Sequence, residues 1–101
     1  MIDRSITFLG AGNMANAIIR GLIAAGTPPA RISATDRSPE RVAEMEKAHG
    51  IRVGMDNVAA AKEAEVVVLS VKPQALDKLL KEVASAVDRS KLVVSVAASD
   101  T

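Results

Sequence analysis

The chain has no cysteine, tryptophan or tyrosine, and it has a single phenylalanine, Phe8, and a single histidine, His49. Without cysteine it forms no disulfide, and with one imidazole it lacks the thiolate and histidine ligands of a zinc site. One aromatic ring provides neither a stacking platform for single-stranded nucleic acid nor a cage for a quaternary ammonium ion. We therefore expect no metal-binding residue and no ligand of these classes.

An excess of charge and a long apolar run are also missing. Thirteen basic residues stand against twelve acidic ones, so the formal charge is only +1, far from the positive stripe that a nucleic-acid phosphate backbone requires. No apolar run approaches the 18 residues of a membrane span, and the first residues contain no signal-peptide core. We expect no nucleic-acid partner, no membrane segment and a cytoplasmic location. The 101 residues, 49% hydrophobic, suffice for one domain with one aliphatic core.

Short aliphatic runs alternate with longer amphipathic segments along the whole chain. The runs predict strands at residues 5–9, 32–35, 51–53, 66–69 and 92–96. Apolar residues at helical spacing predict helices at residues 13–25, 39–49 and about 57–64, and a fourth that begins at Pro73 and carries Leu76, Leu79, Leu80, Val83 and Val87 on one face. This order predicts an α/β fold with a doubly wound, Rossmann-like parallel sheet of five strands in the order 3-2-1-4-5.

A glycine-rich turn joins the first strand to the first helix in the pattern GxGxxA. Gly10 permits the tight turn, Gly12 removes a Cβ from the path of a pyrophosphate, and Ala15 keeps the helix close to the sheet. The free N–H groups of Asn13 and Met14 then point at an anion at the positive end of the helix dipole. The alternative is that the turn merely connects a strand to a helix.

The second strand ends at Asp36, Arg37 and Ser38, where the nucleotide is selected in folds of this class. An acidic residue here accepts the ribose 2′-hydroxyl of NAD, whereas an arginine and a hydroxyl bind the 2′-phosphate of NADP. The two signals conflict, so both cofactors stay open. The structural alternatives are that Ser38 only caps the next helix and that Arg37 is solvated.

The loop after the fourth strand contains Lys72, which either places a positive charge near a cofactor phosphate or is simply solvated. A different class of ligand also remains open. Methyltransferases that use S-adenosylmethionine share a glycine-rich turn and an acidic residue after the second strand.

Three segments in order resemble the N-terminal part of pyrroline-5-carboxylate reductase: residues 6–15 (ITFLGAGNMA), 66–74 (VVVLSVKPQ) and 92–98 (LVVSVAA). The resemblance covers essentially the whole chain. It implies the reduction of 1-pyrroline-5-carboxylate to L-proline by hydride transfer from NADPH, with NADH also accepted.

The same resemblance implies a role for each part of the predicted cofactor site. Residues 10–14 hold the pyrophosphate, residues 36–38 the adenosine ribose and its 2′-phosphate, residues 71–73 the nicotinamide ribose, and residues 96–98 lie beside the nicotinamide. The complete predicted set is Leu9, Gly10, Ala11, Gly12, Asn13, Met14, Asp36, Arg37, Ser38, Asn57, Val71, Lys72, Pro73, Val96, Ala97 and Ala98.

The chain departs from that family in two ways. Ser99 stands where the family has glycine, and the family's helical domain, which forms the dimer and most of the substrate pocket, is missing from these 101 residues. We therefore expect residues 1–101 to form a dinucleotide-binding domain with no catalytic residue, inactive alone, which forms a homo-oligomer only with the missing domain. The alternatives are a non-catalytic NADP-binding module, a truncated gene fragment, or the domain of a related F420- or NADP-dependent reductase.

Overall fold

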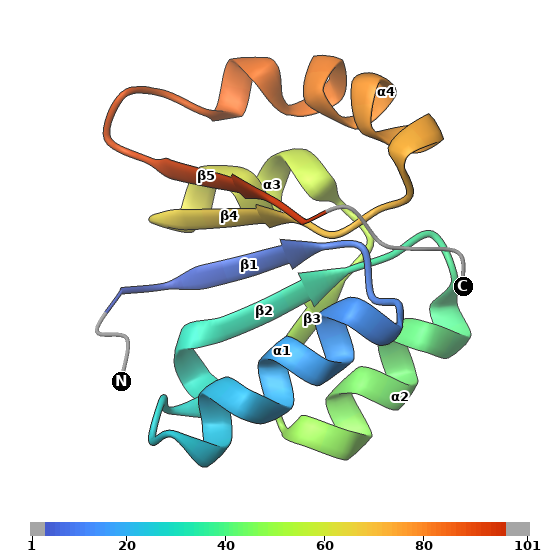
Figure 1. Ribbon diagram of the computed structural model, residues 1–101, viewed down its shortest axis with the longest axis vertical. Coiled ribbons are helices and arrows are strands. Elements are labelled where there is room, and N and C mark those ends of the chain that lie inside the picture. The colour runs from blue at the N-terminus through green and yellow to red at the C-terminus, as the bar shows by residue number, and fades with distance from the viewer. Residues whose placement is uncertain (1–3, 97–101) are drawn as a thin grey trace.

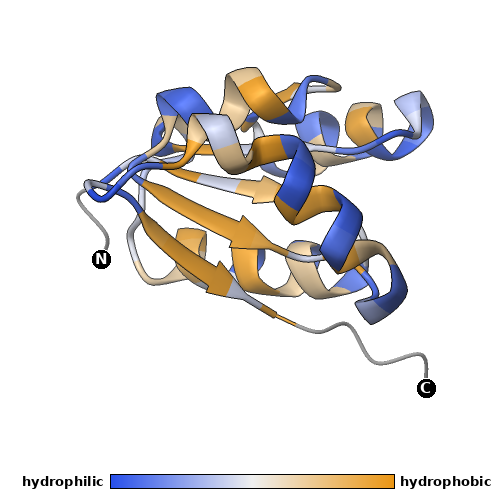
Figure 2. Ribbon diagram, turned by 90° about the horizontal axis from the view of Figure 1, so that it is seen from above, coloured by the Kyte–Doolittle hydropathy of each residue, from blue (hydrophilic) through white to orange (hydrophobic). Residues whose placement is uncertain are grey.

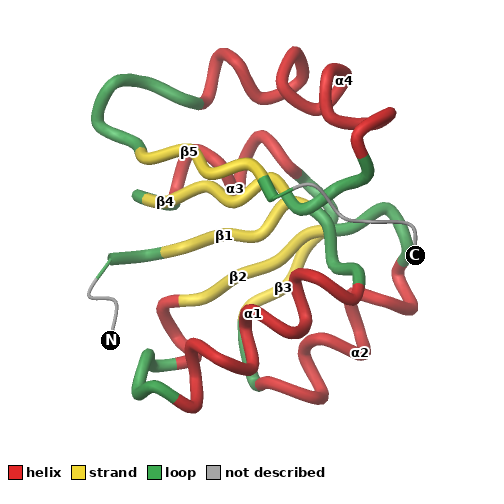
Figure 3. Tube along the Cα trace, in the orientation of Figure 1, coloured by secondary structure: helices red, strands yellow, loops and turns green. Residues whose placement is uncertain are grey.

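A parallel five-stranded sheet with helices on both faces makes up the computed structural model, which describes residues 4–96 (Figure 1; Figure 3). The strand order is β3-β2-β1-β4-β5, as predicted. The strands are β1 (Ile6–Leu9), β2 (Ile32–Thr35), β3 (Arg52–Gly54), β4 (Val66–Leu69) and β5 (Leu92–Ser95). The helices are α1 (Asn13–Ala24), α2 (Pro39–His49), α3 (Asn57–Glu63) and α4 (Pro73–Val83), with short 3₁₀ turns at Pro29–Arg31 and Ala84–Ala86.

The two central strands, β1 and β4, are buried at every residue. The continuous aliphatic run of β4 is typical of a strand buried on both faces, whereas β1 also buries Thr7, whose hydroxyl accepts a hydrogen bond from the Ser33 hydroxyl at 2.7 Å. They pair in register, Ile6 beside Val66 and Leu9 beside Leu69. Because strand residues alternate between faces, Ile6 and Phe8 join the core beneath α1 and α2, whereas Leu9 joins the core beneath α3 and α4. The sheet is thus covered on both sides, and its central strands carry the glycine-rich turn and the Lys72 loop.

Local signals fix the helix boundaries. The Ser38 hydroxyl accepts a hydrogen bond from the Arg41 N–H at 3.3 Å, and Pro39 opens α2. Gly50 ends α2 in the left-handed conformation, with φ 69°. The Asp56 carboxylate caps α3 through the Ala59 N–H at 3.1 Å. These boundaries agree with the sequence prediction to within one or two residues.

The fourth helix differs from the expectation. It ends at Val83 and tightens into a 3₁₀ turn, so Val87 lies beyond it. Leu79 and Val83 are buried against the sheet with Leu76 packed beside them, whereas Leu80 is 42% exposed. Leu80 follows Leu79 directly and therefore lies about 100° further around the helix, off the stripe that meets the sheet.

The edge strand β5 is apolar over its first three residues (Figure 2), and all four of its residues are exposed. Leu92 and Val94 are 55% and 37% exposed, and they line a shallow groove of about 500 Å³ beside Ile18 and Leu22 of α1.

Within residues 4–96 no helix is long and apolar enough to cross a membrane.

Candidate nucleotide-binding site

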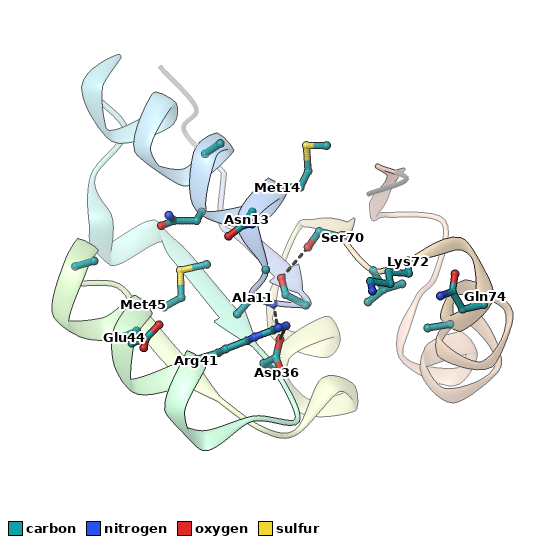
Figure 4. Close-up of a pocket in the computed structure, with 17 residues that line it drawn as sticks. Ala11, Asn13, Met14, Asp36, Arg41, Glu44, Met45, Ser70, Lys72 and Gln74 are labelled. Carbon is teal, nitrogen blue, oxygen red and sulfur yellow. Dashed lines mark hydrogen bonds and ion pairs between the residues drawn. The ribbon is translucent and has the colours of Figure 1, made fainter. Parts of the chain in front are cut away.

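A cavity of about 1100 Å³ opens where the strand order reverses, outside the carboxyl ends of β1 and β4 (Figure 4). This is the place where doubly wound sheets bind their ligands. The glycine-rich turn and the start of α1 form one wall, the Lys72 loop and the start of α4 form the opposite wall, and α2 contributes a third side. The lining residues are Gly10, Ala11, Gly12, Asn13, Met14, Asn16, Ala17, Asp36, Arg41, Glu44, Met45, Ala48, Ser70, Val71, Lys72, Gln74 and Ala75.

The glycine-rich turn is fixed from both neighbouring strands. The Gly10 N–H donates to the Thr35 carbonyl at 2.8 Å, and the Ser70 hydroxyl donates to the Gly10 carbonyl at 2.8 Å. Gly10 has a φ of 111°, and a Cβ at this position would lie 2.4 Å from the Ser70 carbonyl oxygen. Only glycine fits this conformation and this close approach.

Asp36 holds the turn from a third direction. One carboxylate oxygen, Oδ2, accepts the Ala11 N–H at 2.8 Å, and the other, Oδ1, accepts the Ser38 N–H at 2.9 Å. The Arg41 guanidinium lies over the same carboxylate, with Nη1 3.9 Å from Oδ2 (Figure 4). The carboxylate at the end of β2 thus points toward the turn.

The start of α1 presents open hydrogen-bond donors to the cavity. Gly12 is the N-cap, and no side chain among residues 4–96 caps this end, whereas Ser38 and Asp56 cap α2 and α3. The first N–H groups of a helix have no partner inside the helix, and the helix dipole adds a partial positive charge there. This end of α1 therefore suits a phosphate group.

The cavity brings together eight of the predicted residues. They are Gly10, Ala11, Gly12, Asn13, Met14, Asp36, Val71 and Lys72. The other predicted residues within the described range do not line it: Leu9, Arg37, Ser38, Asn57, Pro73 and Val96. Ala97 and Ala98 lie outside the described residues.

Several predicted residues outside the cavity have other contacts. The Asn57 side-chain oxygen accepts from the Thr35 hydroxyl, and its amide nitrogen donates to Glu82 at 3.3 Å. Leu9 is fully buried, Pro73 is the first residue of α4, and Val96 lines the groove beside β5. Arg37 is exposed next to Asp36.

Sequence reasoning missed the contribution of α2 to the cavity, which comes from Arg41, Glu44, Met45 and Ala48. These four positions follow the spacing i, i+3, i+4 and i+7, so they share one face of the helix. That spacing was a usable signal. Two of the four residues, Arg41 and Glu44, are charged, so the sequence alone suggests a solvent-facing stripe. Only the position of α2 beside the glycine-rich turn shows that they line the cavity.

The sheet order, the glycine-rich turn and the open end of α1 define a Rossmann-like nucleotide-binding domain. More specifically, the chain belongs to the family described as "NADP oxidoreductase coenzyme F420-dependent", which matches residues 5–99. The fold prediction is confirmed.

Several relatives carry the name of the family that the sequence resembles. The chain is 47% identical over 98 residues to pyrroline-5-carboxylate reductase of Vibrio alginolyticus, covering 97% of this chain and 36% of that protein. It is 38% identical to the solved pyrroline-5-carboxylate reductase of Coxiella burnetii, with a TM-score of 0.89 over 95% of this chain and 36% of the other. The resemblance to this family is confirmed, and the chain spans about a third of the length of these relatives.

A more distant structure shows the fold alone. The pyrroline carboxylate reductase of Plasmodium falciparum, solved with NADP bound, is 21% identical and has a TM-score of 0.80 over 96% of this chain and 34% of the other.

Proposed function

We propose that these 101 residues are the NADP(H)-binding domain of a reductase that converts 1-pyrroline-5-carboxylate to L-proline. The observation that carries the proposal is the open start of α1, which follows a glycine-rich turn at the point where the strand order reverses. Both features lie in a chain 47% identical to a pyrroline-5-carboxylate reductase.

The residues that line the cavity fit a dinucleotide. At Gly12 an added Cβ would meet no described atom within 4 Å, so the glycine leaves space that a bound pyrophosphate can use. We assign the pyrophosphate to residues 10–14 and the adenosine end to residues 36–38, with Arg37 and Ser38 toward a 2′-phosphate. Val71 and Lys72 lie on the opposite wall, and we assign the nicotinamide ribose to them.

When bound, NADPH supplies the hydride that reduces the C=N bond of the substrate. The residues described here bind and orient that cofactor, and we assign neither a proton donor nor a substrate-binding residue to them. The part of the longer relatives that this chain does not span is where we place those groups and the oligomer contacts. The cytoplasmic location stays a prediction of the sequence.

Binding of NADPH to the purified 101-residue chain tests the proposal directly. Since the chain has no tryptophan or tyrosine, calorimetry and the fluorescence of the nicotinamide itself are the suitable measurements. We expect NADPH to bind and to raise the melting temperature, because a ligand of the folded state stabilises it. S-adenosylmethionine is the control ligand. A melting temperature that rises with S-adenosylmethionine and not with NADPH would contradict the proposal.

Replacing Arg37 tests the cofactor preference. Arg37→Ala is expected to weaken NADPH about tenfold, the size of one lost hydrogen bond to a charged group, and to leave NADH nearly unchanged. Equal losses for NADPH and NADH in the same titration would show that Arg37 does not contact the 2′-phosphate.

A further inference from the structure

Asp36 can act in two ways, as the residue that selects the nucleotide or as a support for the glycine-rich turn, and its contacts favour the second role. In NAD-binding folds an acidic residue at the end of the second strand accepts the ribose 2′-hydroxyl and repels a 2′-phosphate. To select in this way, the residue must present a carboxylate oxygen to the nucleoside. Here the carboxylate is directed to the glycine-rich turn instead, and its side chain is only 13% exposed.

Each oxygen of this carboxylate has a backbone donor. Oδ2 accepts the N–H of Ala11, the middle residue of the Gly10-Ala11-Gly12 turn, and Oδ1 accepts the N–H of Ser38. Hydrogen bonds to a charged acceptor are about twice as strong as those between neutral groups. Asp36 therefore fastens the turn to the start of the β2–α2 loop.

The turn orients the open N–H groups at the start of α1. Ala11 is followed directly by Gly12, the N-cap, and then by Asn13 and Met14, the first residues of the helix. Fixing the Ala11 peptide group thus fixes the direction from which the chain enters α1. Binding sites that are held in place before the ligand arrives lose less free energy on binding.

Arg41 reduces the repulsion that this carboxylate would exert on a phosphate. Its Nη1 atom lies 3.9 Å from Oδ2, and Arg41 lines the cavity from the first turns of α2. Because the Arg41 side chain is 61% exposed, water screens this pair, and the cation offsets only part of the carboxylate's field toward the cavity.

Resting on the proposed function, we propose that Asp36 is a positioning residue for the glycine-rich turn and does not select between NADH and NADPH. The carboxylate holds the Ala11 N–H, and Arg41 offsets part of its charge toward the cavity.

The variant Asp36→Asn separates the two roles. An amide presents one oxygen and one N–H₂ group, so it cannot accept both backbone N–H groups. A positioning role predicts that NADPH and NADH weaken by the same factor, about threefold to tenfold, with their ratio unchanged within twofold. A selecting role predicts that NADH weakens while NADPH tightens, which changes the ratio tenfold or more and would overturn the proposal.

The matched control is Glu40→Gln, which removes a carboxylate in the first turn of α2 that does not line the cavity. It is expected to leave both affinities within twofold. An equal loss with this variant would show that the effect of Asp36→Asn comes from net charge and would overturn the positioning role.

Hydrogen exchange without any cofactor provides an independent measurement. In Asp36→Asn the Ala11 amide is expected to exchange at least tenfold faster, while the Ile19 amide in the buried middle of α1 keeps its rate if the fold is intact. An unchanged Ala11 rate would overturn the inference.

If the wild-type chain binds neither cofactor, the proposed function fails, and the Ala11 rate still decides whether Asp36 holds the turn. Should Asp36→Asn fail to fold, Asp36→Ser is measured in its place.

Discussion

Two glycines of the same turn are required for different reasons. Gly10 is required by the fold, because its φ is 111° and a Cβ would collide with the Ser70 backbone. Gly12 is not required by the fold, since an added Cβ would meet no described atom within 4 Å. Its absence of a side chain matters only for a ligand that approaches the start of α1.

Alanine at each glycine gives a distinct expected result. Gly10→Ala should lower the free energy of unfolding by more than about 2 kcal/mol, from backbone strain and the clash. Gly12→Ala should change stability by less than about 0.5 kcal/mol and weaken NADPH binding about tenfold or more. Urea unfolding and calorimetric titration measure the two effects.

Gly21→Ala is the control, because this glycine lies inside α1 with open space around it. It should raise stability by roughly 0.5–1 kcal/mol, the ordinary gain in helix propensity. A folded, stable Gly10→Ala protein would contradict the structure of the turn.

A residue far from the cavity gives a pH dependence. The Ser90 hydroxyl and the Ser90 N–H both donate to Asp88 Oδ1 and lower the pKa of Asp88. A carboxyl whose pKa is lower in the folded state stabilises the fold above its unfolded pKa, and this stabilisation is lost as the pH falls through the folded pKa. The melting temperature of Asp88→Asn should therefore be lower than that of the wild type at pH 7. The difference should shrink as the pH falls below about 4, the ordinary carboxyl pKa, and on through the lower pKa that Asp88 has in the folded state. A difference that does not change with pH would contradict this assignment.

At the scale of elements, one side chain ties the edge of the sheet to a helix end. The Lys91 ammonium donates to the carbonyls of Lys62 and Ala64, at 2.9 and 2.6 Å, at the carboxyl end of α3. Lys91 directly precedes β5, so the contact joins the start of the exposed edge strand to the end of α3. Charged donors at a helix carboxyl end satisfy its open carbonyl groups.

Lys91→Met keeps most of the side chain's length and removes these donors. It should lower the free energy of unfolding by about 1–2 kcal/mol. Lys81→Met is the matched control, because Lys81 is 78% exposed and its ion pair within residues 4–96 is with Asp77, which is 83% exposed. A pair this exposed contributes little. Equal effects of the two variants in urea unfolding would contradict the role of Lys91.

At the scale of the whole molecule, the fold forms a cavity at the carboxyl ends of the strands. The chain spans only about a third of the length of its relatives. The cavity lies at the reversal between β1 and β4 and has a glycine-rich turn, an open helix start and charged side chains. The Vibrio alginolyticus and Coxiella burnetii reductases are each covered to 36% of their length. Cofactor binding and turnover should therefore be separable.

The purified 101-residue chain is expected to bind NADPH and to form no detectable L-proline from 1-pyrroline-5-carboxylate. The reason is that these residues are assigned neither a proton donor nor a substrate-binding group. Amino-acid analysis after prolonged incubation measures the product, with a full-length pyrroline-5-carboxylate reductase as the positive control. Measurable proline from the 101-residue chain would contradict the division of roles.

The sequence alone predicted the class and order of the elements, since these depend on local causes. Several signals act over a short range, wherever the segment lies in the fold. They are the spacing of apolar residues, Pro39 and Pro73 at helix starts, and Gly50 at a helix end. The predicted strand order 3-2-1-4-5 likewise placed the first strand at the centre with the fourth beside it, as the structure has them. The glycine-rich turn was identifiable for the same reason.

Only the tertiary structure decided which side chains meet across the turn. Asp36 and Ala11 are 25 residues apart, and no local pattern reveals that this carboxylate faces the turn. The α2 stripe enters the cavity, and Leu80 stays exposed, because of where these helices lie on the sheet. The sequence determined the elements because their causes lie within a few residues. Packing decided the site, because its contacts join strands and loops that only folding brings together.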